Sequence, residues 1–237
     1  MTPTAPHQKP YFDALAELFQ TFAADTDPIY RSWVDGAVPD LSDQVDSRAV
    51  DLGCGSGRFA DLLADRHHEV LGVDIAAREI DMARAEHPRP NLTFEVCSLL
   101  DVTPSADGLF DTVFTVNTVH HLRAHDVVVP HLRSLLRPGG HLVLVDIVDP
   151  GEWRSLDWHI HEAFADAEES YRSRSRNPEI AADVLRLRLH PAWLEHVSTN
   201  VPLTPDEFHK QYEAVFPGIE FSTLHKEVVA AYWRAPG

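Results

Sequence analysis

The chain has 237 residues and a formal net charge of −17, from 37 acidic and 20 basic side chains. Because so acidic a surface repels phosphate backbones, we expect no nucleic-acid partner. Two cysteines, Cys54 and Cys97, are too few for a disulfide framework. The sequence shows no secretory signal and no apolar run of about eighteen residues, so we expect a cytoplasmic protein that does not span a membrane.

The first 47 residues are expected to form a helical segment ahead of the core. Apolar side chains recur at helical spacing as far as Phe22, which predicts an amphipathic helix that ends near Asp25. A second, short helix is expected with Pro28 at its first position, where proline is tolerated. Residues 1–10, which contain three prolines, are expected to form a tail.

Residues 48–150 alternate short apolar runs with amphipathic helical segments. The strands that this pattern predicts are residues 49–52, 70–73, 92–96, 110–116 and 141–148. Strands that are separated by helical crossovers form a parallel sheet with helices on both faces.

The remaining chain is expected to complete that domain. Residues 151–216 contain helical segments that are broken before prolines, and we expect this insertion to cover the ligand end of the sheet. Residues 217–237 contain two strand-like runs with a tight connection, which predicts an antiparallel hairpin at one sheet edge.

The most informative stretch is V-D-L-G-C-G-S-G-R, residues 50–58, in which a strand meets a glycine turn and then a helix. Alternating glycines allow a sharp turn and a close approach of the backbone to a ligand. The amides at the start of the helix favour an anionic group. Dinucleotide-binding domains use a related G-x-G-x-x-G spacing, whereas Gly53, Gly55 and Gly57 alternate and follow an acid, Asp51.

This stretch resembles motif I of the class I S-adenosylmethionine-dependent methyltransferases. Four further segments resemble later motifs of the family in the same order, namely G-V-D-I (72–75), F-D-T-V (110–113), N-T-V-H-H-L (117–122) and L-L-R-P-G-G (135–140). The resemblance implies an α/β, Rossmann-like fold with a seven-stranded, mostly parallel sheet, an antiparallel C-terminal hairpin and a helical lid. It also implies S-adenosyl-L-methionine as cofactor and S-adenosyl-L-homocysteine as product.

Cofactor contacts are carried over from the family position by position. The resemblance implies that the loop residues admit the methionine portion, that Asp51 faces its ammonium group, and that Asp74 accepts both ribose hydroxyls. Ile75 would pack on the adenine, and Ser98 stands where many relatives have an adenine-binding acid. The implied cofactor-binding residues are Asp51, Gly53, Cys54, Gly55, Gly57, Asp74, Ile75, Ser98, Leu99 and Asn117.

Three histidines are candidates for the base that a hydroxyl or ammonium acceptor requires. His120 and His121 follow the fourth expected strand, and His159 lies in the insertion. A packing role for the histidine pair is equally compatible with the sequence. His159 and His161 stand two residues apart, on different faces of a helix, so we expect no metal site.

The acceptor is expected to be a small molecule, such as a secondary metabolite, methylated on oxygen, nitrogen or carbon. Trp153, Trp158, Phe164 and Trp193 are expected either to line its pocket or to form the core of the insertion. Arg172, Arg174 and Arg176 are expected on a solvated loop. The alternatives are a protein or peptide methyltransferase, and a protein that binds the cofactor without methyl transfer. We expect a monomer or a homodimer.

Overall fold

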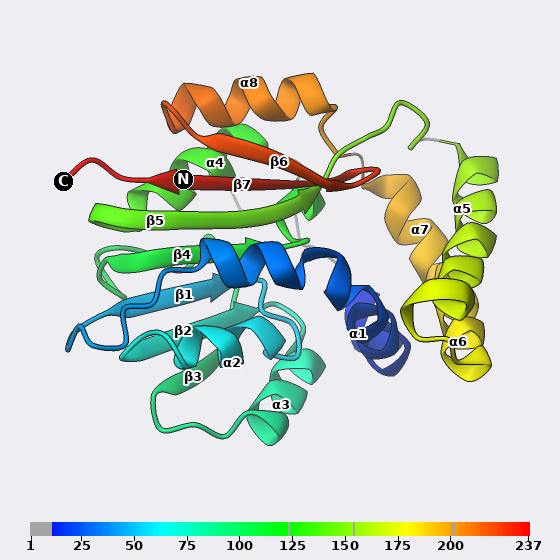
Figure 1. Ribbon diagram of the computed structural model, residues 1–237, viewed down its shortest axis with the longest axis horizontal. Helices are drawn as coiled ribbons and strands as arrows, with labels where there is room; N and C mark the ends of the chain where they lie inside the picture. The colour runs from blue at the N-terminus through cyan, green and yellow to red at the C-terminus, as the bar shows by residue number, and fades with distance from the viewer. Residues whose placement is uncertain (1–10, 123, 154, 201) are drawn as a thin grey trace, which may run out of the picture.

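The computed structural model describes residues 11–237 except Arg123, Arg154 and Val201, so the expected tail of residues 1–10 lies outside the described part. Within the described part, seven strands form one sheet in the order β3-β2-β1-β4-β5-β7-β6 (Figure 1). The strands are β1 (Arg48–Leu52), β2 (Glu69–Asp74), β3 (Leu92–Val96), β4 (Phe110–Val116), β5 (Leu136–Ile147), β6 (Glu220–His225) and β7 (Val228–Arg234).

Strands β1 to β5 run parallel, and β7 pairs antiparallel with both β5 and β6. Ile147, the last residue of β5, pairs with Val228, the first residue of β7 after the hairpin turn. The sheet therefore confirms the predicted mostly parallel architecture with an antiparallel C-terminal hairpin. Since β1 to β4 are parallel, the loops that follow them meet at one edge of the sheet, the carboxyl edge.

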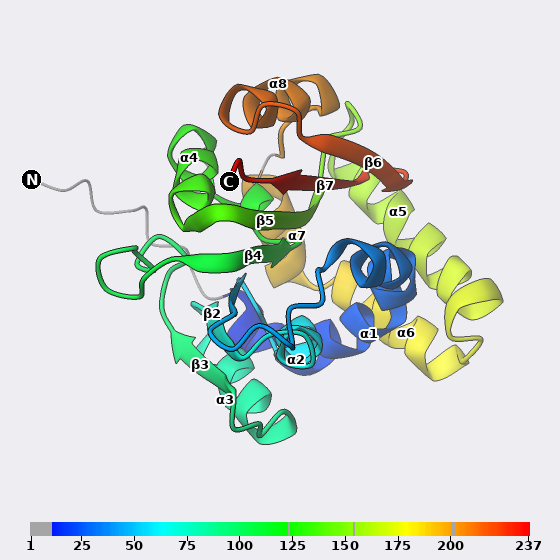
Figure 2. The same cartoon turned by 60° about the vertical axis from the view of Figure 1, so that its left-hand side comes forward.

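Helices cover both faces of the sheet (Figure 2). One face is packed by α2 (Arg58–Ala64), α3 (Ala77–Glu86) and the second half of α1 (Tyr11–Ala37). The opposite face is packed by α4 (His125–Ser134) and α8 (Pro205–Val215). Among the described helices, even the 27-residue α1 lacks the continuous apolar length of a membrane span.

A helical cap lies beyond the carboxyl edge of the sheet (Figure 1). We define the cap as the first half of α1 together with four later helical segments. These segments are α5 (Leu156–Glu169), the π-helical turn η2 (Ser170–Arg174), α6 (Pro178–Arg188) and α7 (Pro191–Thr199). The cap has its own apolar cluster, in which the rings of Phe19 and Phe22 lie 6.2 and 6.0 Å from that of Trp193.

The prediction of two separate N-terminal helices is wrong. A single helix, α1, continues through Pro28, and its direction changes between the cap and the sheet face (Figure 1). Proline removes one backbone donor from a helix interior. The missing donor of Pro28 would have bonded to the carbonyl of Ala24. Side-chain donors reach two neighbouring carbonyls, since Thr26 Oγ1 donates to the carbonyl of Phe22 at 2.9 Å and Arg58 Nη1 to that of Ala23 at 2.9 Å.

The connection from β3 to β4 contains turns and no helix among residues 97–109. One other expectation also needs correction. Arg174 does not lie on a solvated loop, since its side chain is 7% exposed and its Nε donates to Asp25 Oδ2 at 2.8 Å. Arg172 and Arg176 are exposed.

Candidate active site

The loop between β1 and α2 folds back over the end of β2. Gly53 N and Cys54 N both donate to the carbonyl oxygen of Val73, at 2.8 and 2.9 Å. Gly53, Gly55 and Gly57 have φ angles of 79°, 50° and 84°, in the left-handed region that residues with a Cβ adopt at a cost. The turn itself therefore requires glycine, and it places this loop at the carboxyl edge of the sheet.

Asp74, the last residue of β2, is hydrogen-bonded to this loop. Its Oδ2 accepts from Gly55 N at 3.0 Å, and its Oδ1 accepts from Ala76 N at 2.8 Å. Ile75, the expected adenine contact, is half-buried next to it.

Asp51 is a buried acid in β1, two residues before Gly53, and is 1% exposed. Its Oδ1 has no hydrogen-bond partner among the described residues. Burial and, to a lesser extent, the negative charge of Asp74 raise the pKa of Asp51 to about 8. A carboxyl group in this environment is stabilised in its charged form by a neighbouring cation.

Asn117 follows β4 at the same edge. Its φ of 52° is unusual for a residue with a side chain, and its buried Oδ1 has no partner among the described residues. Its Nδ2 donates to the hydroxyl of Tyr30 in α1 at 3.5 Å. The second half of α1 thus reaches the loop after β4.

The loop after β3 is a tight turn. Ser98 Oγ accepts from Leu100 N at 3.3 Å, and Ser98 N donates to Asp101 Oδ2 at 3.1 Å. Leu99 is 5% exposed and belongs to the sheet core. The side chain of Leu99 therefore packs inward.

His120 is paired with a buried acid that the sequence analysis did not select. Its Nδ1 lies 2.5 Å from Asp146 Oδ1, and its backbone N donates to Asp146 Oδ2 at 2.9 Å. The two side chains are 5% and 3% exposed. Because a carboxylate only accepts, Nδ1 carries the proton, and in the neutral ring Nε2 is the basic nitrogen.

The ring of His121 packs between that of His120 and that of His196, a histidine of the cap, at a tilt to both. The ring centroids of His120 and His121 are 3.8 Å apart, and those of His121 and His196 are 4.7 Å apart. Asn200 Nδ2 lies 2.8 Å from His121 Nδ1. Burial, and then the charge on His120, lowers the pKa of His196 to about 4. Burial also lowers the pKa of His121 well below its usual value.

His159 lies inside the cap, away from this arrangement of side chains. Its Nε2 is 2.7 Å from the carbonyl oxygen of Trp153, and its ring is flanked by Trp153 and Trp158. A catalytic role for His159 stays a prediction. Of the aromatic residues expected in a pocket or a core, Trp153 and Trp193 are buried in the cap cluster and Phe164 is 56% exposed.

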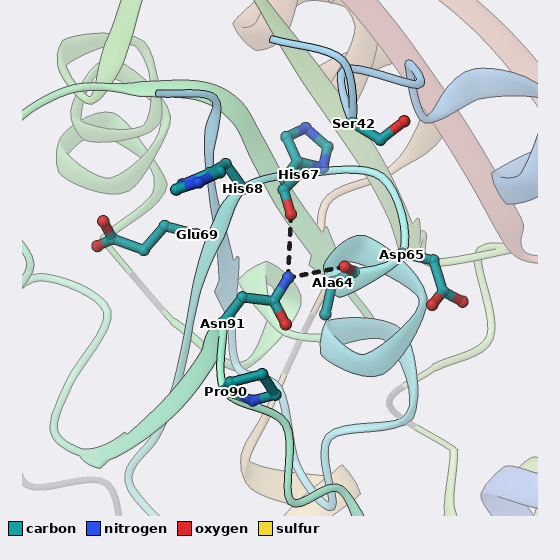
Figure 3. A pocket seen from close by; sticks show the side chains of 8 residues that line it. All are labelled: Ser42, Ala64, Asp65, His67, His68, Glu69, Pro90 and Asn91. Carbon is teal, nitrogen blue, oxygen red and sulfur yellow. Dashed lines mark hydrogen bonds between the residues drawn. The ribbon is translucent and has the colours of Figure 1, made fainter. Parts of the chain in front are cut away.

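An open hollow of about 530 Å³ lies near the start of β2 (Figure 3). Asn91 Nδ2 at its wall donates to the carbonyls of Ala64 and His67, at 2.8 and 3.1 Å. Glu69 opens β2 and borders the hollow, whereas Asp74 ends that strand. The hollow is thus at the opposite end of β2 from the loop that contains Gly53, Gly55 and Gly57, which we call the glycine loop. We do not assign the active site to the hollow.

Comparison with known proteins points to a family. Residues 50–144 match the family model of a methyltransferase domain. The matched segment contains the glycine loop, Asp74, Asn117 and the histidine pair. The comparisons support the class I S-adenosylmethionine-dependent methyltransferase family for this domain.

Similar proteins agree with this methyltransferase assignment. A ubiquinone biosynthesis O-methyltransferase of Paracidovorax citrulli is 29% identical over 49% of this chain and 48% of its own length. The O-methyltransferase cnsE of Penicillium expansum is 26% identical over 46% of this chain and 41% of its own. An S-adenosylmethionine-dependent methyltransferase structure from Mesorhizobium loti has a TM-score of 0.59 at 16% identity, covering 87% of this chain and 97% of its own, and so shares the fold. The chain spans about half the length of the curated relatives it matches.

The residues of this methyltransferase fit the family's cofactor. Two buried oxygens at the carboxyl edge, Asp51 Oδ1 and Asn117 Oδ1, have no partner among the described residues. Such atoms are rare in folded proteins unless a ligand or water satisfies them. Asp51 would supply a negative charge for the ammonium group of the cofactor.

Sequence reasoning missed Asp146, His196 and Asn200. Asp146 had a detectable signal, since it is an acid within the otherwise apolar run of residues 142–148, and a buried acid requires a partner. His196 and Asn200 had none, because they meet His121 only through the packing of the cap.

Proposed function

We propose that this protein transfers the methyl group of S-adenosylmethionine to a hydroxyl group of a small molecule. The observation that carries this proposal is the buried contact between His120 Nδ1 and Asp146 Oδ1 at 2.5 Å. A carboxylate acceptor requires no base, whereas a hydroxyl must lose a proton as it attacks. The similarity to two O-methyltransferases supports an oxygen acceptor.

The reaction would be a direct displacement. When bound, the cofactor supplies a methyl group on a sulfonium ion whose leaving group is a neutral thioether. The acceptor hydroxyl passes its proton to His120 Nε2 as its oxygen forms the bond to the methyl carbon. Asp146 holds Nδ1–H and stabilises the positive ring that results. The cap and α1 would exclude water and align the two reactants, which contributes several kcal/mol to lowering the barrier.

The cofactor contacts are part of the same proposal. We propose that the loop residues hold the methionine carboxylate, Asp51 its ammonium group and Asp74 the ribose. Ser98 is proposed at the adenine through its hydroxyl proton, since its oxygen accepts from Leu100 N. Leu99 contributes through its backbone amide, because its side chain is packed in the core.

We also propose a cytoplasmic setting and a small-molecule acceptor on chemical grounds. Both cysteines carry free thiols, which agrees with the reducing environment expected for a cytoplasmic protein. A net charge of −17 favours a small-molecule acceptor over nucleic acid. We expect a monomer or a homodimer.

Methyl transfer from labelled S-adenosylmethionine tests the proposal, with phenols, alcohols and amines supplied as acceptors. We expect labelled product from a hydroxyl compound. The His120→Gln variant should reduce its formation by about 10²- to 10⁴-fold while cofactor affinity is retained. His68→Gln is the matched control, because His68 is exposed near the start of β2. Product from amines alone, or equal rates in both variants, would contradict the proposal.

A further inference from the structure

Helix α7 of the cap brings two polar side chains against the histidine pair. Asn200, directly after α7, places its Nδ2 2.8 Å from His121 Nδ1, and the ring of His196 packs at a tilt against that of His121, with centroids 4.7 Å apart. The rings of His121 and His120 are also tilted to each other, with centroids 3.8 Å apart. A continuous series of contacts thus runs from the cap to the proposed base.

The position of Asn200 is fixed by the cap rather than by the sheet. Its backbone N donates to the carbonyl of His196 at 3.0 Å, and its own carbonyl accepts from Trp153 Nε1 at 2.6 Å. The same indole nitrogen also contacts the carbonyl of Val197 at 3.1 Å. Asn200 is 6% exposed, so its side chain is held where water does not compete for it.

His120 and His121 belong to the core, since they form the short helix η1 (Val119–His121) directly after β4. The contact between Asn200 and His121 therefore crosses from the cap to the core. His121 is held on several sides, by Asn200, by the rings of His120 and His196, and by a hydrogen bond with the backbone of Asn117. Held in this way, its ring covers one side of His120.

We propose that Asn200 is a positioning residue that holds His121 against His120, so that the base is fixed only when the cap is docked on the core. This inference rests on the proposed function. It divides the roles of two neighbouring histidines: His120 accepts the proton, and His121 supports the ring of His120. Docking of the cap on the core then both encloses the acceptor and fixes the ring of His120.

Three variants on the same stretch of chain test this proposal. Asn200→Asp preserves the shape of the side chain and places a carboxylate beside His121. Asn200→Ala removes the contact. Ser198→Ala is the control, because Ser198 is exposed and its hydroxyl contacts only the carbonyl of Glu195 in the same helix.

Ring 15N spectra of the histidines, recorded across pH with S-adenosylhomocysteine present, give a readout that does not depend on turnover. We expect Asn200→Asp to raise the pKa of His121, because a neighbouring negative charge favours the charged ring. We expect Asn200→Ala to reduce kcat about ten- to a hundredfold through misplacement of the base, with cofactor affinity unchanged within about twofold. Ser198→Ala should alter neither quantity.

The two proposals fail in different ways. An unchanged titration of His121 in Asn200→Asp, or an unchanged kcat in Asn200→Ala, would overturn the role of Asn200. Absence of methyl transfer to every hydroxyl acceptor by the wild-type protein would instead overturn the proposed function, and with it the catalytic meaning of the contact. The positioning role would also be contradicted if Asn200→Ala lowered kcat while Asn200→Asp kept both the wild-type kcat and the wild-type titration of His121.

Discussion

Asp51 is a residue that opposes folding and for which we also propose a role in cofactor binding. It is buried, and its Oδ1 has no partner among the described residues. Its pKa is raised from 3.8 to about 8. Between these two pH values the folded protein retains a proton that the unfolded chain releases, so the free energy of unfolding falls as pH rises through this window.

We therefore expect Asp51→Asn to stabilise the ligand-free protein. The gain should be absent near pH 4 and reach roughly 2–4 kcal/mol above pH 8, as measured by urea unfolding at several pH values. The same variant should bind S-adenosylmethionine about ten- to a hundredfold more weakly, because the ammonium group loses its charged acceptor. A variant that is less stable than the wild type at alkaline pH would contradict this explanation.

Gly57 and Gly139 separate two reasons for a glycine. Both have left-handed backbones, with φ of 84° and 77°. A Cβ at Gly57 would lie 2.7 Å from the ring of Phe94, whereas a Cβ at Gly139 would meet nothing within 4 Å. Gly57 is therefore needed both for its φ and for the close packing of the motif.

Alanine at each position tests this distinction. Gly139→Ala should cost about 1–2 kcal/mol for the left-handed backbone alone. Gly57→Ala should cost about 2–4 kcal/mol, because the ring of Phe94 must also move. Urea unfolding measures both losses, and equal losses would show that packing against Phe94 contributes nothing.

At the scale of elements, α1 joins the cap to the core. Its first half packs Phe19 and Phe22 into the cap cluster, and its second half packs Val34 on the sheet face. The sequence predicted a break at Pro28 because intrinsic preference disfavours proline inside a helix. The packing of its two halves on two different parts of the protein overrides that preference, and no local pattern encodes that packing.

The cap itself contains a buried ion pair that fastens α1 to η2. Arg174 contacts Asp25, and Ser170 Oγ also donates to Asp25 Oδ1 at 3.0 Å. The Asp25 side chain is 0% exposed. Arg172, two residues before Arg174, forms an exposed ion pair instead, with its Nη2 2.8 Å from Glu168 Oε1.

Removal of these two arginines should have very different effects on stability. Arg174→Ala leaves a buried carboxylate without its partner, and we expect a loss of about 3–5 kcal/mol. Arg172→Ala removes an exposed pair, which is worth about 0–1 kcal/mol. Thermal or urea unfolding compares them, and similar losses would show that Asp25 finds another partner or takes up a proton.

At the scale of the whole molecule, the sheet was predictable from the sequence, whereas the contacts around His120 and His121 were not. Alternating apolar runs and the turn at Gly53 predicted the parallel strands, because those signals are local and repeat along the chain. The partner of His120 is Asp146, 26 residues away on the neighbouring strand, and Asn200 reaches His121 across 79 residues. Contacts of this kind depend on how the cap packs on the core, which no local pattern encodes.

The measurement that tests the central claim most directly is calorimetric titration of the purified protein with S-adenosylmethionine and S-adenosylhomocysteine, with NADH as control. The alternating glycines, the buried acid Asp51 and the carboxylate of Asp74 together predict micromolar binding of the first two ligands and none of NADH. Absence of binding by a correctly folded protein, or binding of NADH instead, would contradict the assignment of the glycine loop and the proposed methyl transfer that depends on it.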